Sequence, residues 1–295
     1  WTYHELNAVR TVARAAGHAF DLTTMVRDPL RRIVSEYEYL VHSPLGKFAV
    51  HQDQWLYVDQ RGHQSQTVAT LTRLGRRIVD AHHRRATHGS GGMSLEDFVN
   101  AAPGRHPAHN RMVRHLASDA PRAWLGGAYP ATCCMGTIAR DTTVAWARTA
   151  GGDGLAANVS AALRTLAREE PVFSDEGGLP RSIGEAELRV ALRRLADEFV
   201  AVGVLERAAE SAALFEHTLG WTRAWANRTS RAAGTGRWAP DARGRGGRRT
   251  RVSAALAARI YQLNALDTAL YAAANALLSE RLERLTKPRT SSSRK

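Results

Sequence analysis

The sequence predicts a helix-rich α/β protein. Two short runs, residues 20–26 and 199–205, are rich in β-forming and apolar residues and have the length of single buried strands. Each run leads directly into a helical pattern. At 295 residues the chain is long enough to bury a large core, and one domain with insertions is the natural expectation.

The N-terminal part reads as helix, strand and helix. An apolar stripe predicts a helix over residues 1–16, which Gly17 ends before the first strand begins. After that strand, Asp28 suits an N-cap, and Pro29 suits the first helical position, where a missing N–H costs nothing. The helix that follows is expected to cover residues 28–41.

The middle of the chain is predicted to contain short helices separated by irregular stretches. A basic helix is expected over residues 68–85, and Ser94 with Asp97 forms a capping box for the helix after it. Another short helix is expected over residues 109–117. Prolines and glycines in residues 119–153 predict a loop or insertion there.

The last part is again helical, apart from the second strand. Helices are predicted over residues 155–169, 185–196, 206–219 and 252–285. Gly220 is expected to close the helix over residues 206–219. The final segment reads either as one long helix or as two helices broken near Asn264.

The junction between the first strand and the next helix is a candidate anion site. Arg31, Arg32 and Ser35 lie within two turns of the helix start, where backbone N–H groups and the helix dipole favour phosphate. An arginine fork adds charged hydrogen bonds. The spacing alone is more typical of an ordinary strand-to-helix junction whose arginines face solvent, because phosphate sites are a minority of such junctions.

The formal charge of +13 indicates a polyanionic partner, such as nucleic acid, an anionic membrane surface or an acidic glycan. A coding bias towards arginine and alanine would give the same charge without any ligand. No apolar run approaches the length of a membrane span, and no secretory leader opens the sequence. The two cysteines, Cys133 and Cys134, are adjacent and lack metal-site spacing, so no metal is expected.

One sequence motif in the junction is more specific than the spacing of its arginines and serine. R-D-P-x-x-R-x-x-S, formed here by Arg27, Asp28, Pro29, Arg32 and Ser35, resembles the 3′-phosphate-binding motif of sulfotransferases. The longer stretch TMVRDPLRRIVSEYEYL resembles the same segment of the heparan sulfate 6-O-sulfotransferases. The resemblance implies that Arg27 and Ser35 bind the 3′-phosphate of 3′-phosphoadenosine 5′-phosphosulfate (PAPS), and that Arg32 braces the helix start.

Further segments resemble the same family in the same order. They are SLEDFV with NRMVRHLAS, the helix–strand–helix segment around Gly203, Leu205 and Glu206, the loop NRTSRAAGTG, and the helical stretch LNALDTALYAAA. In the family, the loop that corresponds to NRTSRAAGTG closes over the phosphates of PAPS. The resemblance therefore implies cofactor contacts at Thr229, Ser230, Arg231 and Ala232, while Arg228 stands where the family has asparagine.

The resemblance also implies a fold and a reaction. The fold is a P-loop-like sulfotransferase domain over residues 1–287, with a central parallel sheet flanked by helices. Insertions are expected near 42–92, 119–182 and 237–251, and a disordered tail over 288–295. The reaction moves a sulfuryl group from PAPS to a hydroxyl of a glycosaminoglycan-like polysaccharide, with the 6-O position of glucosamine in heparan sulfate as the expected acceptor.

The substrate-binding residues implied by the family are Trp1 and Tyr39, where Tyr39 replaces a family histidine. The family's 5′-phosphosulfate loop, K-x-G-x-x-[ST] after a strand, is not found in this sequence, and its histidine base would lie just before Trp1. The chain is therefore expected to be the C-terminal part of an enzyme and inactive alone. By the same resemblance the intact protein is expected to be a type II membrane protein of the Golgi, with its catalytic domain in the lumen.

Two other functions stay open at this stage. One is a non-catalytic sulfotransferase-like module. The other is a nucleic-acid or polyanion binder that uses the Gly/Arg-rich residues 240–251. Because no aromatic side chain interrupts that run, base stacking is not supported there, and no specific nucleic-acid partner is expected. The expected partner is an anionic polysaccharide.

Overall fold

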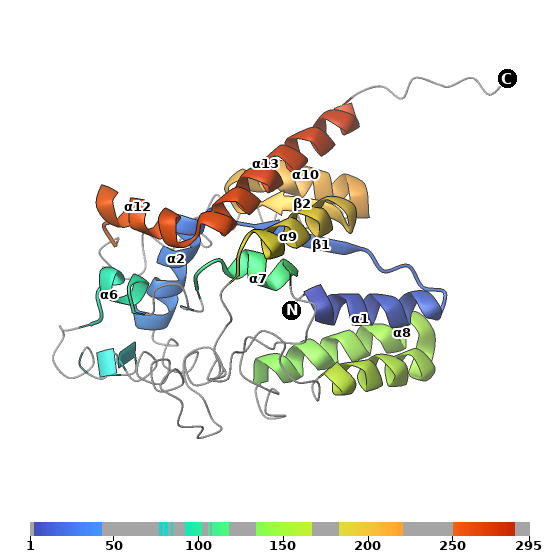
Figure 1. Cartoon of the computed structure of the whole chain (residues 1–295). Coiled ribbons are helices and arrows are strands. Elements are labelled where there is room, and N and C mark those ends of the chain that lie inside the picture. The colour runs from blue at the N-terminus through green and yellow to red at the C-terminus, as the bar shows by residue number, and fades with distance from the viewer. Residues whose placement is uncertain are drawn as a thin grey trace.

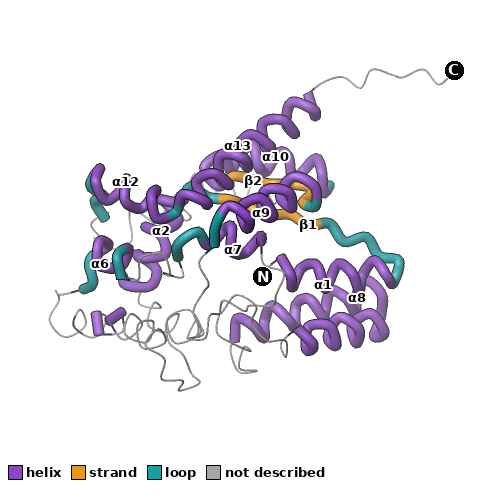
Figure 2. Tube along the Cα trace, in the orientation of Figure 1, coloured by secondary structure: helices purple, strands orange, loops and turns teal. Residues whose placement is uncertain are grey.

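The fold is helix-rich α/β, as the sequence predicts (Figures 1 and 2). The computed structural model describes residues 3–42, 77–78, 80–81, 84, 92–101, 106, 108–117, 134–166, 183–220 and 250–286. The insertions expected near 42–92 and 119–182 lie partly outside these ranges. The insertion expected near 237–251 lies almost wholly outside them, and the tail over 288–295 lies entirely outside.

The sheet of the described chain has two parallel strands, β1 (Leu22–Val26) and β2 (Phe199–Val204). The strands pair from Leu22 opposite Phe199 to Val26 opposite Val204, with an irregularity after Leu22. Both strands match the runs predicted from the sequence. Because the pairing is parallel, the two carboxyl ends lie at the same edge of the sheet.

The largest core surrounds β2. Helices α10 (Ala208–Leu219) and α13 (Ala265–Thr286) pack on this strand, as Figure 1 shows, and α9 (Glu185–Asp197) contacts it as well. The short helix α7 (Arg111–Ala117) packs against α9. Buried apolar side chains from all of these elements form one cluster, which includes Val113, Leu195, Val202, Phe215 and Leu270.

The predicted ends of two of these elements are confirmed. A single 3-10 turn, η3 (Leu205–Arg207), connects β2 to α10. Helix α10 ends at Gly220, whose φ of 65° lies in the left-handed region that glycine adopts without strain. The last segment is two helices, α12 (Ala254–Leu263) and α13, which are separated at Asn264.

A second core lies beside the first helix after β1. Helix α2 (Pro29–Tyr37) continues into a π-helical turn, η1 (Glu38–His42), and packs against α12 and against α6 (Leu95–Val99). Tyr37 and Phe98 meet in this core, with ring centroids 5.7 Å apart. The predicted cap of α6 is confirmed, because Ser94 Oγ accepts the N–H of Asp97 at 3.0 Å.

The third core corrects one prediction. Residues 134–153, expected to lie in a loop, belong to helix α8 (Cys134–Leu166), which packs along α1 (Tyr3–Ala15). The glycines that suggested a loop form a kink instead, with Gly152 at a φ of 72°. The stretch is helical because its apolar residues are buried against α1, where Ala147 and Val159 form a cluster with Val9.

Candidate anion-binding site

The candidate site lies at the edge of the sheet where both strands end. Arg27 and Asp28 follow β1 directly, and Glu206 lies in the turn that follows β2. The register brings Val26 opposite Val204, so these turns are neighbours. In open α/β sheets, ligands bind outside the carboxyl ends of the strands, which makes this edge the expected location for a site.

Asp28 sets the start of helix α2. Its Oδ1 accepts the backbone N–H of Arg31 at 2.9 Å, and Pro29 occupies the first helical turn, as predicted. The other carboxylate oxygen, Oδ2, accepts the hydroxyl of Tyr261 from α12 at 3.0 Å. The chain's own carboxylate therefore takes up one of the N–H groups that were expected to be free for an anion.

Arg27 is the cation at the centre of this edge. Its side chain is 23% exposed, and its Nε lies 3.9 Å from Glu206 Oε1. Within the described chain this buried Nε has no hydrogen-bond partner. Burial lowers the pKa of Arg27, and Glu206 opposes that shift while Arg31 and Arg32 add to it. Arg27 is thus a half-buried cation whose positive charge is only partly compensated.

Glu206 faces Arg27 but is anchored elsewhere. Its Oε2 accepts the backbone N–H of Asp28 at 3.1 Å. Burial raises the pKa of Tyr271 from α13, and the charge of Glu206 raises it further. Each of the two carboxylates beside Arg27 therefore accepts a backbone N–H, that of Arg31 for Asp28 and that of Asp28 for Glu206.

Arg31 and Ser35 are on the outer part of α2. Arg31 is exposed and Ser35 is half-buried in the middle of the helix, one turn after Arg31. Arg27 precedes the helix and is not part of it, whereas Ser35 lies in its second turn. The two residues expected to hold the 3′-phosphate are therefore on either side of the start of α2.

Arg32 has a different environment from Arg27. Its Nη1 donates to Glu36 at 3.1 Å, and its Nη2 donates to Asn264 Oδ1 at 3.1 Å and also to the carbonyl of Ala108. The same Nη2 lies 3.6 Å from buried Asp267. Arg32 therefore braces α2 against the junction of α12 and α13, and its terminal nitrogens bond the chain itself.

Asn110 and Asp267 complete this second cluster. Asn110 Oδ1 accepts the N–H groups of Leu266 and Asp267, and Asp267 accepts those of Met112 and Val113. Asn110 has a φ of 49°, a conformation that asparagine adopts more readily than most residues. Burial raises the pKa of Asp267, and that effect outweighs the opposing effect of Arg32.

Several predicted site residues are not brought to this edge. Tyr39 is 49% exposed on η1, beyond the end of α2. Trp1 and the loop residues Thr229, Ser230, Arg231 and Ala232 lie outside the described residues. Sequence reasoning gave no role to Tyr261, Tyr271 or Glu206. The position of Glu206 just after the second strand is the signal that could have found it.

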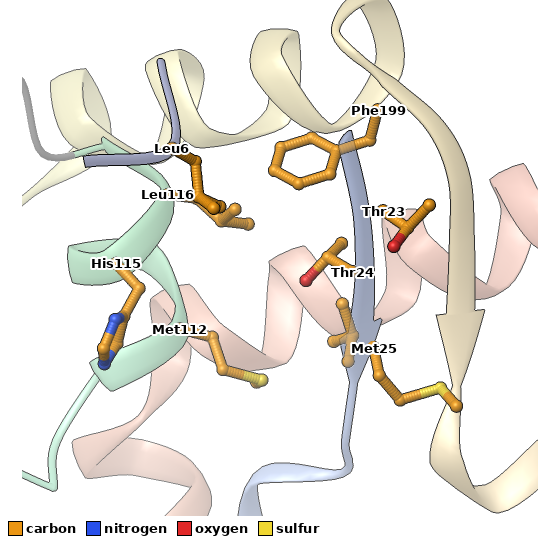
Figure 3. A pocket seen from close by; sticks show the side chains of 9 residues that line it. Leu6, Thr23, Thr24, Met25, Met112, His115, Leu116 and Phe199 are labelled. Carbon is orange, nitrogen blue, oxygen red and sulfur yellow. The ribbon is translucent and has the colours of Figure 1, made fainter. Parts of the chain in front are cut away.

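A separate apolar pocket flanks β1 (Figure 3). It is lined by β1 from Thr23 to Val26, by Leu6 of α1, by Phe199 and by Met112, His115 and Leu116 of α7. Arg27 and Ser35 are not among its lining residues. Among the described residues, no group of three or more His, Cys, Asp or Glu side chains is placed to hold a metal ion.

No family model matches the chain, and no curated protein or solved structure gives a significant match. What the site does is therefore inferred from its geometry together with the sequence motifs.

Proposed function

We propose that this chain is part of a PAPS-dependent sulfotransferase with a P-loop-like fold, and that Arg27 and Ser35 bind the 3′-phosphate of PAPS. The observation that carries the proposal is Arg27, a half-buried cation at the carboxyl edge of the parallel sheet. Its Nε has no hydrogen-bond partner among the residues that the structure describes. A phosphate supplies the acceptors and the negative charge that this guanidinium lacks.

The contacts between distant segments support the same proposal. Three of the segments that resemble the sulfotransferase family supply Arg32, Asn110 and Asp267, which meet around the buried carboxylate of Asp267. Two of them supply Arg27 and Glu206, whose Nε and Oε1 lie 3.9 Å apart. Polar residues from separate segments that resemble the family therefore contact one another at or near the candidate site. Such contacts are expected if the segments form one functional unit.

The proposed reaction is sulfuryl transfer to a hydroxyl of a glycosaminoglycan-like polysaccharide, at the 6-O position of glucosamine in heparan sulfate. The acceptor oxygen attacks the sulfur of PAPS, the bond from sulfur to the phosphate oxygen breaks, and the bisphosphate leaves. The role of this chain is to bind and orient the nucleotide through Arg27 and Ser35, so that the donor is positioned for in-line attack. The proton of the acceptor hydroxyl passes to a general base, for which the sulfotransferases that the sequence resembles use a histidine.

The proposal extends to location. A sulfotransferase of this type is expected in the Golgi lumen. None of the helices in the described ranges is long and apolar enough to cross a membrane.

The direct test is the affinity of the chain for 3′-phosphoadenosine 5′-phosphate (PAP), measured by calorimetry and by the ligand-induced rise in melting temperature. Wild-type protein is expected to bind PAP, and Arg27→Ala is expected to abolish binding with little loss of folding. Arg189→Ala, which removes an exposed arginine on α9, is the matched control and should bind as the wild type does.

Equal PAP affinity in the wild type and Arg27→Ala would refute the site. The second candidate function, binding of nucleic acid or another polyanion through net charge, predicts a different pattern. Under that proposal the two arginine substitutions would weaken binding of a single-stranded oligonucleotide to the same small extent, and PAP would not raise the melting temperature.

A further inference from the structure

Glu206 brings a carboxylate to the edge where the two strands end. It lies in η3, the turn after β2, and it contacts the turn after β1. Its Oε2 accepts the backbone N–H of Asp28 at 3.1 Å, and its Oε1 lies 3.9 Å from Arg27 Nε. The two oxygens thus face a backbone N–H and a guanidinium, the kinds of donor that bind phosphate at a helix start.

The start of α2 explains why a carboxylate from another strand is needed there. In a capping box, a Glu or Gln at the third helical position accepts the N–H of the N-cap residue. In α2 that position is Arg31, whose side chain has no acceptor. Glu206 supplies the missing acceptor to the N-cap, Asp28, from the turn after β2. The chain therefore uses its own anion where the helix start would accept an external one.

The charge of Glu206 opposes an external anion at Arg27. The side chains of Arg27 and Glu206 are only 23% and 15% exposed, so solvent ions screen their interaction less than they would on the surface. The carboxylate neutralises part of the guanidinium charge and repels a phosphate that approaches the same group. At 3.9 Å, however, it forms an ion pair and not a hydrogen bond with Arg27 Nε, which keeps that donor accessible to a stronger acceptor.

We propose that Glu206 is an internal competitor at the anion site, whose carboxylate takes up donors that a bound phosphate would use and thereby limits the affinity of the chain for phosphate. The inference rests on the proposed function, because it takes Arg27 as the phosphate ligand. It goes beyond that function by identifying a residue that stabilises the free protein at the expense of ligand binding.

The test measures PAP affinity by calorimetry, together with the melting temperature of the free protein. Glu206→Gln keeps the length of the side chain and an oxygen that can accept the N–H of Asp28, but it removes the charge. It is expected to bind PAP about tenfold more tightly, the scale of one charge interaction at a partly exposed site. Without ligand its melting temperature is expected to fall, because the ion pair with Arg27 is lost. A residue that only supports the fold would lower both quantities.

Glu210→Gln is the matched control. Glu210 lies on α10, is 49% exposed, and its Oε1 accepts the Nε–H of Arg207 at 2.9 Å. The control removes the same unit of negative charge a short distance along the chain, from a carboxylate that pairs with Arg207 and not with Arg27. PAP affinity is therefore expected to stay at the wild-type value.

Each outcome decides between the two proposals. Unchanged or weaker PAP affinity in Glu206→Gln would overturn this inference, while loss of binding in Arg27→Ala would still support Arg27 as the ligand. An equal gain in Glu206→Gln and Glu210→Gln would also overturn it, since net charge would then be the cause. If neither the wild type nor Glu206→Gln binds PAP, the proposed function fails and this inference fails with it.

Discussion

Arg32 and Asn264 are joined by a hydrogen bond of 3.1 Å from Nη2 to Oδ1, although one belongs to the first turns of α2 and the other lies between the last two helices. Asn264 Oδ1 also accepts the N–H of Asn110 at 3.0 Å, so a single amide oxygen connects three distant segments. This contact fixes where α2 starts relative to the junction of α12 and α13.

Removal of the Asp267 carboxylate is expected to destabilise the fold strongly. Asp267 is fully buried, accepts two backbone N–H groups and lies beside Arg32. Asp267→Ala leaves these groups without a partner and should cost about 3–5 kcal/mol of unfolding free energy. Urea unfolding measures the loss. Asp153→Ala, which removes an exposed carboxylate of α8, should leave stability unchanged, and equal effects of the two substitutions would contradict the prediction.

The buried histidine pair is expected to make the fold sensitive to acid. His106 and His109 stack with their ring centroids 4.9 Å apart, and both are buried. Burial and then Arg32 lower the pKa of His109 to about 4, and burial followed by His109 puts the pKa of His106 well below 6.5. The Nδ1 of His106 accepts the N–H of Ala108 at 3.0 Å, a bond that protonation of this nitrogen would break.

The sign of the pH dependence follows from these directions. The unfolded chain takes up protons at these histidines near pH 6.5, whereas the folded chain does so at His109 only near 4. The contribution of the neutral histidines to the free energy of unfolding is therefore fully present above about pH 6.5. It falls as the pH is lowered towards 4, by roughly 3 kcal/mol for His109. Urea unfolding across this range measures the slope. His109→Gln should reduce the slope and His217→Gln, on the exposed side of α10, should not; a slope unchanged in His109→Gln would refute this prediction.

Gly203 is expected to tolerate no side chain. A Cβ at this position of β2 would lie 2.6 Å from Met25 Sδ, 2.9 Å from Phe215 and 3.0 Å from Ser211. Gly203→Ala should therefore destabilise the protein by about 1–3 kcal/mol through overpacking. Thermal unfolding is the measurement. Gly92→Ala places its methyl group in open space and should leave the free energy of unfolding nearly unchanged. Comparable losses of stability at both glycines would show that steric overlap is not the cause.

Asp28 is expected to stabilise the start of α2 as its N-cap. Asp28→Ala removes the acceptor of the Arg31 N–H and of the Tyr261 hydroxyl, and should cost about 1–2 kcal/mol. Asp28→Asn retains a capping oxygen and should lose less. The free energy of unfolding of the two variants gives the comparison, and an equal loss in both would indicate that the negative charge matters more than the cap.

Local features of the fold were predictable because their causes lie within a few residues. Asp28 caps α2 and Gly220 ends α10, as the sequence predicts, since capping depends on the backbone of the adjacent turn. Both strands were also predictable, because each is a short run of apolar, β-forming residues with the length of a single buried strand. The helical residues 134–153 were missed because their glycines suggest a break, whereas burial of Ala147 against α1 keeps the stretch helical.

The sequence by itself determined the strand-to-helix junction and its arginines, because the string from Arg27 to Ser35 carries both the turn chemistry and the positive charge. Only the tertiary structure distinguished those arginines. Arg32 is bound by Asn264 and Asp267, whereas the Nε of Arg27 lies 3.9 Å from the carboxylate of Glu206, which accepts the N–H of Asp28 instead. The physical reason is that a guanidinium binds a ligand only if the folded chain leaves it short of acceptors. Those acceptors come from residues far away in the sequence.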